Sequence, residues 1–282
     1  MTTYRLSRRL TTGEIRRGSF HDVLPEYRAG ERWLFLSPHD DDLAIAGGLA
    51  IAVAGAEGVE MRARIVTDGA MGYTSAVGAD RIRDVRREET AACFAILGVD
   101  DYDWYDYPDA GLAPWQGRRR ASDVSEAPHK VAGYTGLQNS FVAELRAWRP
   151  ERLILLSPQD YHPDHKMVHQ EALISLFHAR GDIWPELGAP LEADPIVHEI
   201  AAYSPFAAAP DLELRCHEDV LHRKLDAIAA YASQRQIARL VESVRSAGPV
   251  EYLRTMPFEF YNAAAYAGYF RRGPSGDGDI DV

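Results

Sequence analysis

Apolar and polar positions form two kinds of pattern along most of the chain. Short apolar runs that pass into polar loops indicate strands, and they lie at 33–41, 61–73, 101–111 and 152–165, with a further strand expected at 196–206. Ala-rich or amphipathic stretches typical of helices lie at 43–58, 81–99, 137–150, 167–179 and 218–234. Strands and helices are therefore expected to alternate.

This alternation predicts an α/β fold. Strands separated by helices favour a parallel arrangement, because the chain must cross over between them. We expect a Rossmann-like, mostly parallel β-sheet with helices on both faces. In such sheets ligands bind at the carboxyl ends of the strands, so we expect the active site at that edge.

Length and composition fit one domain. The 282 residues are 46% hydrophobic, which is enough for one substantial core. We expect a single domain over 1–282, with its core at about 33–260 and an N-terminal extension at 1–30. A Gly- and Asp-rich flexible tail is expected at 273–282.

Net charge and cysteine content exclude several classes of protein. The formal net charge of -11 argues against a general binder of nucleic acid or anionic membranes. No apolar run reaches the ~18 residues of a membrane span, and the first residues lack the apolar segment of a secretory signal. Cys93 and Cys216 are too few for a disulfide framework. We expect a cytoplasmic protein with no membrane span, and a homo-oligomer stays open.

The first candidate site follows the first predicted strand. His39 is followed at once by three carboxylates, Asp40, Asp41 and Asp42. Adjacent acids repel one another and attract a cation. The alternative is a solvated acidic turn or a helix N-cap, where Asp is also favoured.

A second polar segment, Tyr161-His162-Pro163-Asp164-His165, ends the strand and polar loop predicted at 152–165. Two imidazoles, one carboxylate and an open position form a recurrent catalytic zinc set, because zinc accepts N and O donors and needs a vacancy for water. The two segments together supply such a set at corresponding strand ends. We therefore expect a metal site between them, with one Zn²⁺ per chain or another divalent metal in its place.

These residues resemble the PIG-L/LmbE-like family of zinc-dependent N-acetylglucosaminyl deacetylases. The family has a His-Pro-Asp-Asp-Glu type loop and a later His-x-Asp-His, which here read 39–43 and 162–165. Asp40 stands where the family usually has Pro, and Leu43 where it often has Glu. Spacing alone leaves the roles of Asp40, Asp41 and Asp42 open, and the resemblance assigns them.

The resemblance implies a role for each residue of the two segments. The implied zinc ligands are His39, Asp42 and His165. Asp41 would be the general base, His162 would assist at the scissile carbonyl, and Asp164 would orient or polarise His162. His169 lies four residues after His165, as in some zinc proteases, but Lys166 replaces the Glu of that motif, so we expect His169 to be structural.

Weaker matches extend the resemblance over about 33–260. They are Thr67-Asp68-Gly69, Arg86-x-x-Glu89, Tyr107-Pro108-Asp109, Lys224 through Tyr231-x-Ser233-Gln234, and Glu259-Phe260. Arg86 and Asp109 are candidate substrate contacts. Arg86 could instead pair with Glu89 on a helix surface, and Asp109 could be a turn residue.

The resemblance implies a zinc-dependent hydrolase that removes an N-acetyl or other N-acyl group from an amino sugar, with a soluble small molecule or glycoconjugate as substrate. An amidase that cleaves a thiol-conjugate pseudodisaccharide, as mycothiol-conjugate amidase does, is the nearest alternative. A sugar-binding module without catalysis is the third possibility. The metal-ligand set, which binding alone would not require, favours an enzyme.

Overall fold

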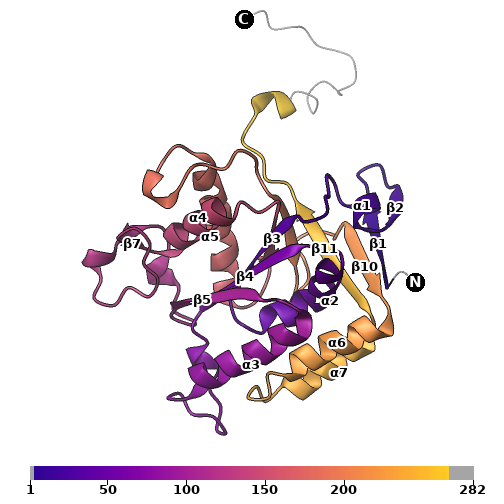
Figure 1. Ribbon diagram of the computed structural model, residues 1–282, viewed down its shortest axis with the longest axis horizontal. Coiled ribbons are helices and arrows are strands. Elements are labelled where there is room, and N and C mark those ends of the chain that lie inside the picture. Colours follow the sequence, from indigo (N-terminus) through magenta and orange to yellow (C-terminus); the bar gives the residue numbers. More distant parts are fainter. Residues whose placement is uncertain (1–2, 267–282) are drawn as a thin grey trace, which may run out of the picture.

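A nine-stranded sheet runs through the computed structural model, which describes residues 3–266 (Figure 1). The strands are β1 (Tyr4–Arg9), β2 (Ile15–Gly18), β3 (Arg32–Ser37), β4 (Glu60–Thr67), β5 (Asp101–Tyr107), β8 (Arg152–Leu156), β9 (Ile196–Ile200), β10 (Leu212–Cys216) and β11 (Val250–Met256). Their order is β2-β1-β10-β11-β9-β8-β3-β4-β5. Two further strands, β6 (Arg119–Arg120) and β7 (Tyr134–Thr135), pair with each other.

Helices connect most of these strands. They are α1 (Phe20–Val23), α2 (Asp42–Ala56), α3 (Ile82–Leu97), α4 (Leu137–Trp148), α5 (Pro163–Arg180), α6 (Glu218–Ala229) and α7 (Ile237–Ala247). Short 3₁₀ turns lie at Ala70–Gly72, Ala113–Trp115, Ala121–Asp123, Pro185–Leu187 and Ala263–Tyr266. Among the described helices, none is both long and apolar enough to cross a membrane.

The five strands predicted from the sequence form the parallel part of the sheet. β3 pairs in parallel with β4 on one side and with β8 on the other, β5 extends the sheet beyond β4, and β9 extends it beyond β8. β3 is therefore the central strand of this part. The strands that follow it in the chain extend the sheet first on one side of β3, with β4 and β5, and then on the other, with β8 and β9. Loops after β3 and β8 consequently emerge side by side at the carboxyl edge, where such sheets bind ligands.

The expectation of a mostly parallel sheet is wrong, because the sheet is mixed. β2, β1, β10 and β11 pair antiparallel with one another, and β11 pairs antiparallel with β9. β10 buries Leu212 and Leu214 and exposes Arg215, the alternation typical of antiparallel strands that face water on one side. The segment 1–30, expected to lie outside the core, supplies β1 and β2 at the sheet edge.

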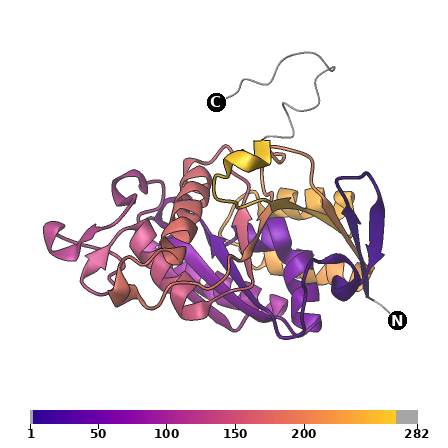
Figure 2. The ribbon, with the colours of Figure 1, turned by 90° about the horizontal axis from the view of Figure 1, so that it is seen from above.

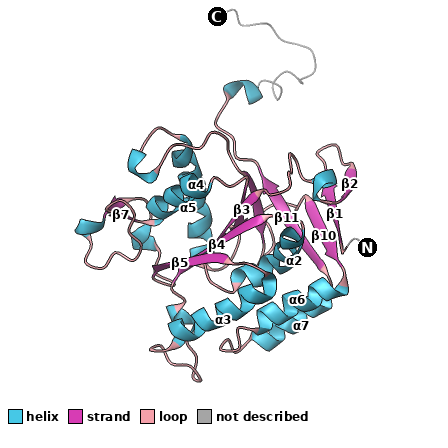
Figure 3. Ribbon diagram, viewed as in Figure 1, coloured by secondary structure: helices cyan, strands magenta, loops and turns pink. Residues whose placement is uncertain are grey.

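Helices cover both faces of the sheet, as expected (Figure 3). Along β3, Trp33 and Phe35 belong to one apolar core together with residues of α2, α3 and α6. The alternate residues Leu34 and Leu36 belong to a second core with residues of α4 and α5. This strand is apolar on both faces because it lies between two helical layers.

Helix α2 lies in the first core and carries Asp42 at its N-terminus. Its residues are buried from Asp42 to Ala54, and Gly47 interrupts the helical geometry with φ of -136°. After this kink, the Glu251 carboxylate of β11 accepts the backbone N–H groups of Leu49 (2.8 Å) and Ala50 (2.9 Å). Glu251 thus caps the second half of the helix, since those N–H groups follow the break.

The N-terminal β1–β2 hairpin and the β6–β7 segment lie at opposite ends of the molecule (Figure 2). The metal-binding loops expected from the sequence lie on the parallel part of the sheet, between these ends. The tail expected at 273–282 lies outside the described residues.

Candidate metal centre

The loop after β3 and the start of α5 bring three donor atoms together. Asp42 Oδ2 lies 3.1 Å from His39 Nδ1 and 3.1 Å from His165 Nε2, and the two imidazole nitrogens are 3.2 Å apart. Pro163 begins α5, so His165 lies in its first helical turn and not in the loop expected from the sequence. Proline at this position is favourable because its missing N–H has no helical partner to lose.

This triangle fits a tetrahedral zinc ion. Zn–N and Zn–O bonds of about 2.0–2.1 Å place neighbouring ligand atoms of a tetrahedron about 3.3 Å apart, close to the separations found here. The second carboxylate oxygen of Asp42 is buried and has no hydrogen-bond partner among the described residues. A cation would satisfy the carboxylate.

Two wider groups of possible metal ligands overlap this triangle. One contains His39, His162 and His165, and the other contains His39, Asp109, His162 and Asp164, with ligand atoms within 4.8 Å of one another. The triangle with Asp42 is more compact, and its members are buried more deeply than His162. It is therefore the donor set that best matches a small divalent cation.

The charges of the triangle support one another. Burial opposes ionisation of Asp42, yet the charge of His165 and hydrogen bonds from both imidazoles hold the pKa of Asp42 well below its usual range. Burial also opposes protonation of His39, but hydrogen bonds to Asp109, Asp164 and Asp42 raise its pKa well above the usual value. The site thus holds an ionised carboxylate that favours a positive partner.

Carboxylates also face the outer nitrogens of both imidazoles. Asp160 Oδ2 lies 3.2 Å from His165 Nδ1. Asp109 Oδ1 and Asp164 Oδ2 lie 3.2 and 3.4 Å from His39 Nε2. Such partners fix the ring orientation and the tautomer of metal-binding histidines. The sequence analysis missed Asp160, although its place in the loop after β8 was a signal.

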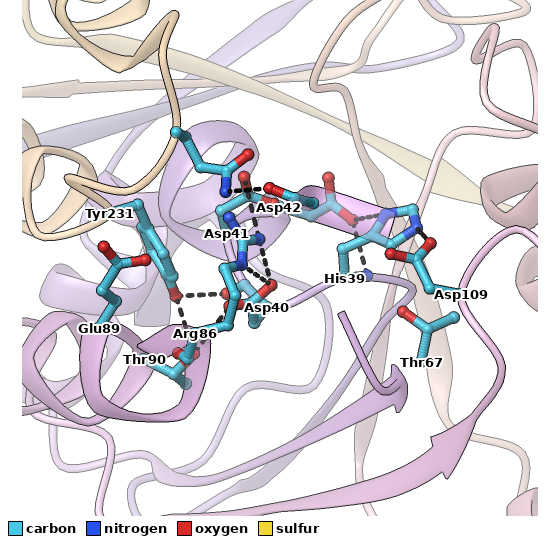
Figure 4. Close-up of polar contacts among 12 residues, drawn as sticks. His39, Asp40, Asp41, Asp42, Thr67, Arg86, Glu89, Thr90, Asp109 and Tyr231 are labelled. Carbon is cyan, nitrogen blue, oxygen red and sulfur yellow. Dashed lines mark hydrogen bonds and ion pairs between the residues drawn. The ribbon is translucent and has the colours of Figure 1, made fainter. Parts of the chain in front are cut away.

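Asp40 is buried beneath the loop that carries His39. Its carboxylate accepts hydrogen bonds from Arg86 of α3, one of them 3.0 Å long, and from Thr90 at 3.0 Å (Figure 4). Burial raises the pKa of Asp40 to about 6, against the opposing charge of Arg86. The Tyr231 hydroxyl donates to the Asp40 carbonyl at 2.6 Å, and the Arg86 guanidinium lies 5.0 Å from the Tyr231 ring centre.

Asp41 differs from both of its neighbours. Its side chain is 15% exposed, and Oδ2 lies 3.3 Å from Nη2 of Arg86. It also lines a cavity of about 390 Å³. Arg86 therefore contacts Asp40 and Asp41, whereas Glu89 accepts hydrogen bonds from the backbone and hydroxyl of Ser233, at 2.6 and 2.7 Å. The alternative of a surface pair between Arg86 and Glu89 is wrong.

His162 is the N-cap residue of α5, and its side chain is 38% exposed. Its ring centre lies 4.5 Å from that of His39. Burial, together with the charge of His39, lowers the pKa of His162 below the usual value. The Asp164 carboxylate is 4.0 Å from His162 Nδ1 and accepts a 2.8 Å hydrogen bond from the Ala110 backbone. The structure therefore places this carboxylate closer to His39 than to His162.

His169 lies outside the centre. Its Nε2 is 3.0 Å from Oε1 of Glu199, which also pairs with Arg254 at 2.7 Å. Asp109 is held by the Met71 backbone N–H at 3.1 Å as well as by His39. Ser233 donates hydrogen bonds to Glu89, and the Gln234 side chain donates one to the Gly72 carbonyl at 3.2 Å.

Comparison with known proteins identifies relatives of the chain. A family model described as GlcNAc-PI de-N-acetylase, PIG-L, matches residues 34–175. This range includes both metal-binding segments. The chain is also 26% identical over 233 residues to 2'-N-acetylparomamine deacetylase of Streptomyces fradiae, covering 77% of this chain and 78% of the relative.

Solved structures share the fold. N,N'-diacetylchitobiose deacetylase from Pyrococcus horikoshii superposes with a TM-score of 0.67 at 22% identity, covering 85% of this chain and 88% of that one. A 4-carboxy-2-hydroxymuconate hydratase from Pseudomonas putida KT2440 superposes with a TM-score of 0.60 at 22% identity, covering 82% and 99%. Since a deacetylase and a hydratase both have this fold, the fold alone does not define the reaction.

Proposed function

The chain belongs to the GlcNAc-PI de-N-acetylase (PIG-L) family, and from this premise we propose that it is a metal-dependent N-deacetylase that hydrolyses an N-acetyl or other N-acyl amide of an amino sugar. The observation that carries the proposal is the triangle of His39, Asp42 and His165 beside a partly exposed Asp41. The two deacetylases named above, from Streptomyces fradiae and Pyrococcus horikoshii, support it.

In this proposal, His39, Asp42 and His165 hold one Zn²⁺. When bound, the metal lowers the pKa of a water molecule to about 7 and polarises the acyl oxygen as a Lewis acid. Asp109 and Asp164 orient His39, and Asp160 orients His165. The close packing of oriented donors supports a preorganised site.

Asp41 is the proposed general base. Of the three consecutive aspartates, Asp40 is buried and occupied by Arg86 and Thr90, and Asp42 points to the imidazoles. Only Asp41 combines exposure with a position on a cavity. It can therefore take a proton from the attacking water.

Arg86 and Asp109 act through other residues in this proposal. A sugar needs an exposed atom to contact, but Arg86 is 4% exposed and the Asp109 side chain is 8% exposed. Arg86 positions Asp41 through its ion pairs with Asp40 and Asp41. Asp109 positions His39. Both thus serve the substrate indirectly.

His162 is the proposed group at the scissile carbonyl. Its ring is the most exposed of the three histidines at the centre, and its lowered pKa leaves it neutral near pH 7. A neutral imidazole N–H can donate a hydrogen bond to the oxyanion that develops on the acyl oxygen. Either His162 or the protonated Asp41 then returns a proton to the leaving amine.

Further parts of the proposal concern setting and fold. The order of the parallel strands, third-second-first-fourth-fifth in chain order, matches the dinucleotide-binding folds and supports a Rossmann-like description. We also propose a cytoplasmic protein that acts on a soluble amino-sugar compound of secondary metabolism. The similarity to 2'-N-acetylparomamine deacetylase supports this part of the proposal.

Metal analysis combined with an acetate-release assay tests the proposal. Protein purified without chelator should contain about one zinc per chain and release acetate from N-acetylglucosaminides, and chelation should stop the reaction. Asp41→Asn should keep its metal and lose turnover, whereas His165→Ala should lose both. Full activity of Asp41→Asn would refute the assignment of the base. Release of a larger acyl fragment instead of acetate would favour a conjugate amidase.

A further inference from the structure

Two neighbouring hollows open beside Asp41. The first, of about 390 Å³, is lined by Asp41, Tyr203, Gln234, Gln236, Ile237, Arg239, Leu240 and Ser243. The second, of about 340 Å³, is lined by Met71, Gly72, Tyr73, Thr74, Gln234, Arg235 and Gln236. They share Gln234 and Gln236 as lining residues, so they are adjacent, and Gln234 donates a hydrogen bond to the Gly72 carbonyl.

The walls of these hollows are firmly attached to the loop that carries the proposed base. Tyr231 is fully buried and its hydroxyl bonds to the backbone of Asp40 at 2.6 Å. Ser233 donates two hydrogen bonds to Glu89 of α3. The segment that presents Gln234 and Gln236 is therefore held at a fixed place relative to Asp41. A ligand that reaches Asp41 through the first hollow can extend along Gln234 and Gln236 toward the second.

The charge of the lining is unusual for this protein. The chain carries a formal net charge of -11, yet the lining contains Arg235 and Arg239 and only one acid, Asp41. Asp41 is already paired with Arg86. Arg235 and Arg239 are exposed and form no ion pair with the described residues. The remaining lining side chains are uncharged amides, hydroxyls, aromatic rings and aliphatic groups.

We infer that the two hollows hold the part of the substrate beyond the N-acyl amide, and that Arg235 and Arg239 select a neutral or anionic group there and reject a cationic one. This inference rests on the proposed function. Amide and hydroxyl side chains suit sugar hydroxyls, and Tyr73, 51% exposed, offers a ring to an apolar sugar face. An ammonium group in the same place would meet two arginines, and the one carboxylate of the lining, Asp41, is already paired with Arg86.

Binding to the metal-loaded Asp41→Asn protein tests the inference without requiring turnover. Three probes differ in the charge of the group beyond the amide: N-acetylglucosamine 1-phosphate is anionic, N,N'-diacetylchitobiose is neutral, and 2'-N-acetylparomamine is cationic. We expect calorimetry to give a Kd for the cationic probe about tenfold weaker than for the neutral probe, and the gap to narrow as added salt screens the charges. Equal binding, preferred binding of the cationic probe, or no binding of any probe would overturn the inference.

Charge reversal provides the matched variant. In Arg235→Glu/Arg239→Glu, the order of affinity for the cationic and anionic probes should invert, because the charge that faces the ligand is reversed. Both arginines are exposed, so the substitutions leave the core intact. Arg17→Glu, on the exposed edge strand β2, changes charge far from the hollows and should leave the order unchanged. An unchanged order in the double variant would overturn the inference. Acetate release by the unmodified enzyme tests the proposed function separately, so the two failures are distinguishable.

Discussion

Asp160 Oδ2 lies 3.2 Å from Nδ1 of His165, on the side of the ring opposite Nε2, the nitrogen proposed to bind the metal. Asp160 is 3% exposed and also accepts the backbone N–H groups of His162 (3.2 Å) and Tyr203 (3.3 Å). One carboxylate therefore orients a ligand and ties together the loops after β8 and β9. Carboxylates in this position tune metal affinity, because they fix the imidazole tautomer that binds the cation.

Replacing this carboxylate should weaken metal binding. In Asp160→Asn the single amide oxygen can keep one of the two backbone hydrogen bonds, and the side chain no longer carries the charge that faces His165. We expect zinc affinity to fall about 10–100-fold, measured by competition with a chelator. Asp219→Asn, at an exposed position of α6, is the control and should leave zinc affinity unchanged. Equal zinc affinity in Asp160→Asn and the unmodified protein would show that Asp160 is structural only.

Arg86 should affect turnover more than substrate binding. Its planar guanidinium forms ion pairs with both Asp40 and Asp41, and a lysine ammonium cannot reproduce this geometry. Arg86→Lys should therefore lower kcat on the order of 10–100-fold, with KM and zinc content close to normal, because Asp41 loses its fixed position. Arg87→Lys, on the exposed side of the same helix, is the matched control. A rise in KM with unchanged kcat would point instead to direct substrate contact.

Local patterns predicted the parallel half of the fold but not the other half. β3 and α2 are apolar around most of their surface, so the sequence marks them clearly. β1, β2, β10 and β11 carry two or three charged residues each, and each exposes some of its positions to water. Their pairing depends on contacts between distant parts of the chain, and the local pattern of apolar and polar residues does not reveal such contacts.

The site shows the same division. His39 follows the end of β3 and His165 lies in the first turn of the helix after β8, and the topology of adjacent parallel strands brings these segments together. The partners of Arg86 could not be read from spacing, because α3 meets the loop after β3 only through the packing of the sheet. Glu89, three residues away, was the nearest candidate in sequence, yet it contacts Ser233 from another part of the chain.

Glu251 should contribute strongly to stability. Its carboxylate pairs with Lys224 at 2.6 Å and caps α2 after the kink at Gly47, all in the core. Glu251→Ala would leave the Lys224 charge buried without a partner and two N–H groups without an acceptor. We expect the free energy of unfolding to fall by about 3–5 kcal/mol, measured by denaturant titration.

A second variant separates the charge from the cap. Glu251→Gln combined with Lys224→Met removes both charges and keeps one oxygen, which can accept one of the two α2 N–H groups. It should restore at least about half of the stability lost in Glu251→Ala, because no unpaired charge remains. A double variant as unstable as Glu251→Ala would contradict the buried charge as the main cause.

The imidazole of His198 should make stability depend on pH. It is 1% exposed, and its Nε2 accepts a 3.1 Å hydrogen bond from Arg152, so it is neutral in the folded state. Burial and the Arg152 charge hold the pKa of His198 well below its usual range. In the unfolded chain the imidazole gains a proton below about pH 6.5. Acidification therefore favours unfolding, by about 1.4 kcal/mol per pH unit from this group until the folded pKa is reached.

Comparison with His198→Gln isolates this contribution, because the amide can still accept from Arg152 but does not titrate. The variant should be less stable than the unmodified protein near neutral pH, and the difference in unfolding free energy should shrink as the pH falls from about 7.5 to about 5. His222→Gln, at an exposed position of α6, is the control. Its difference in unfolding free energy from the unmodified protein should stay constant over the same pH range. Parallel stability curves for His198→Gln and the unmodified protein would mean that His198 has the same pKa in the folded and the unfolded state, contrary to its burial beside Arg152.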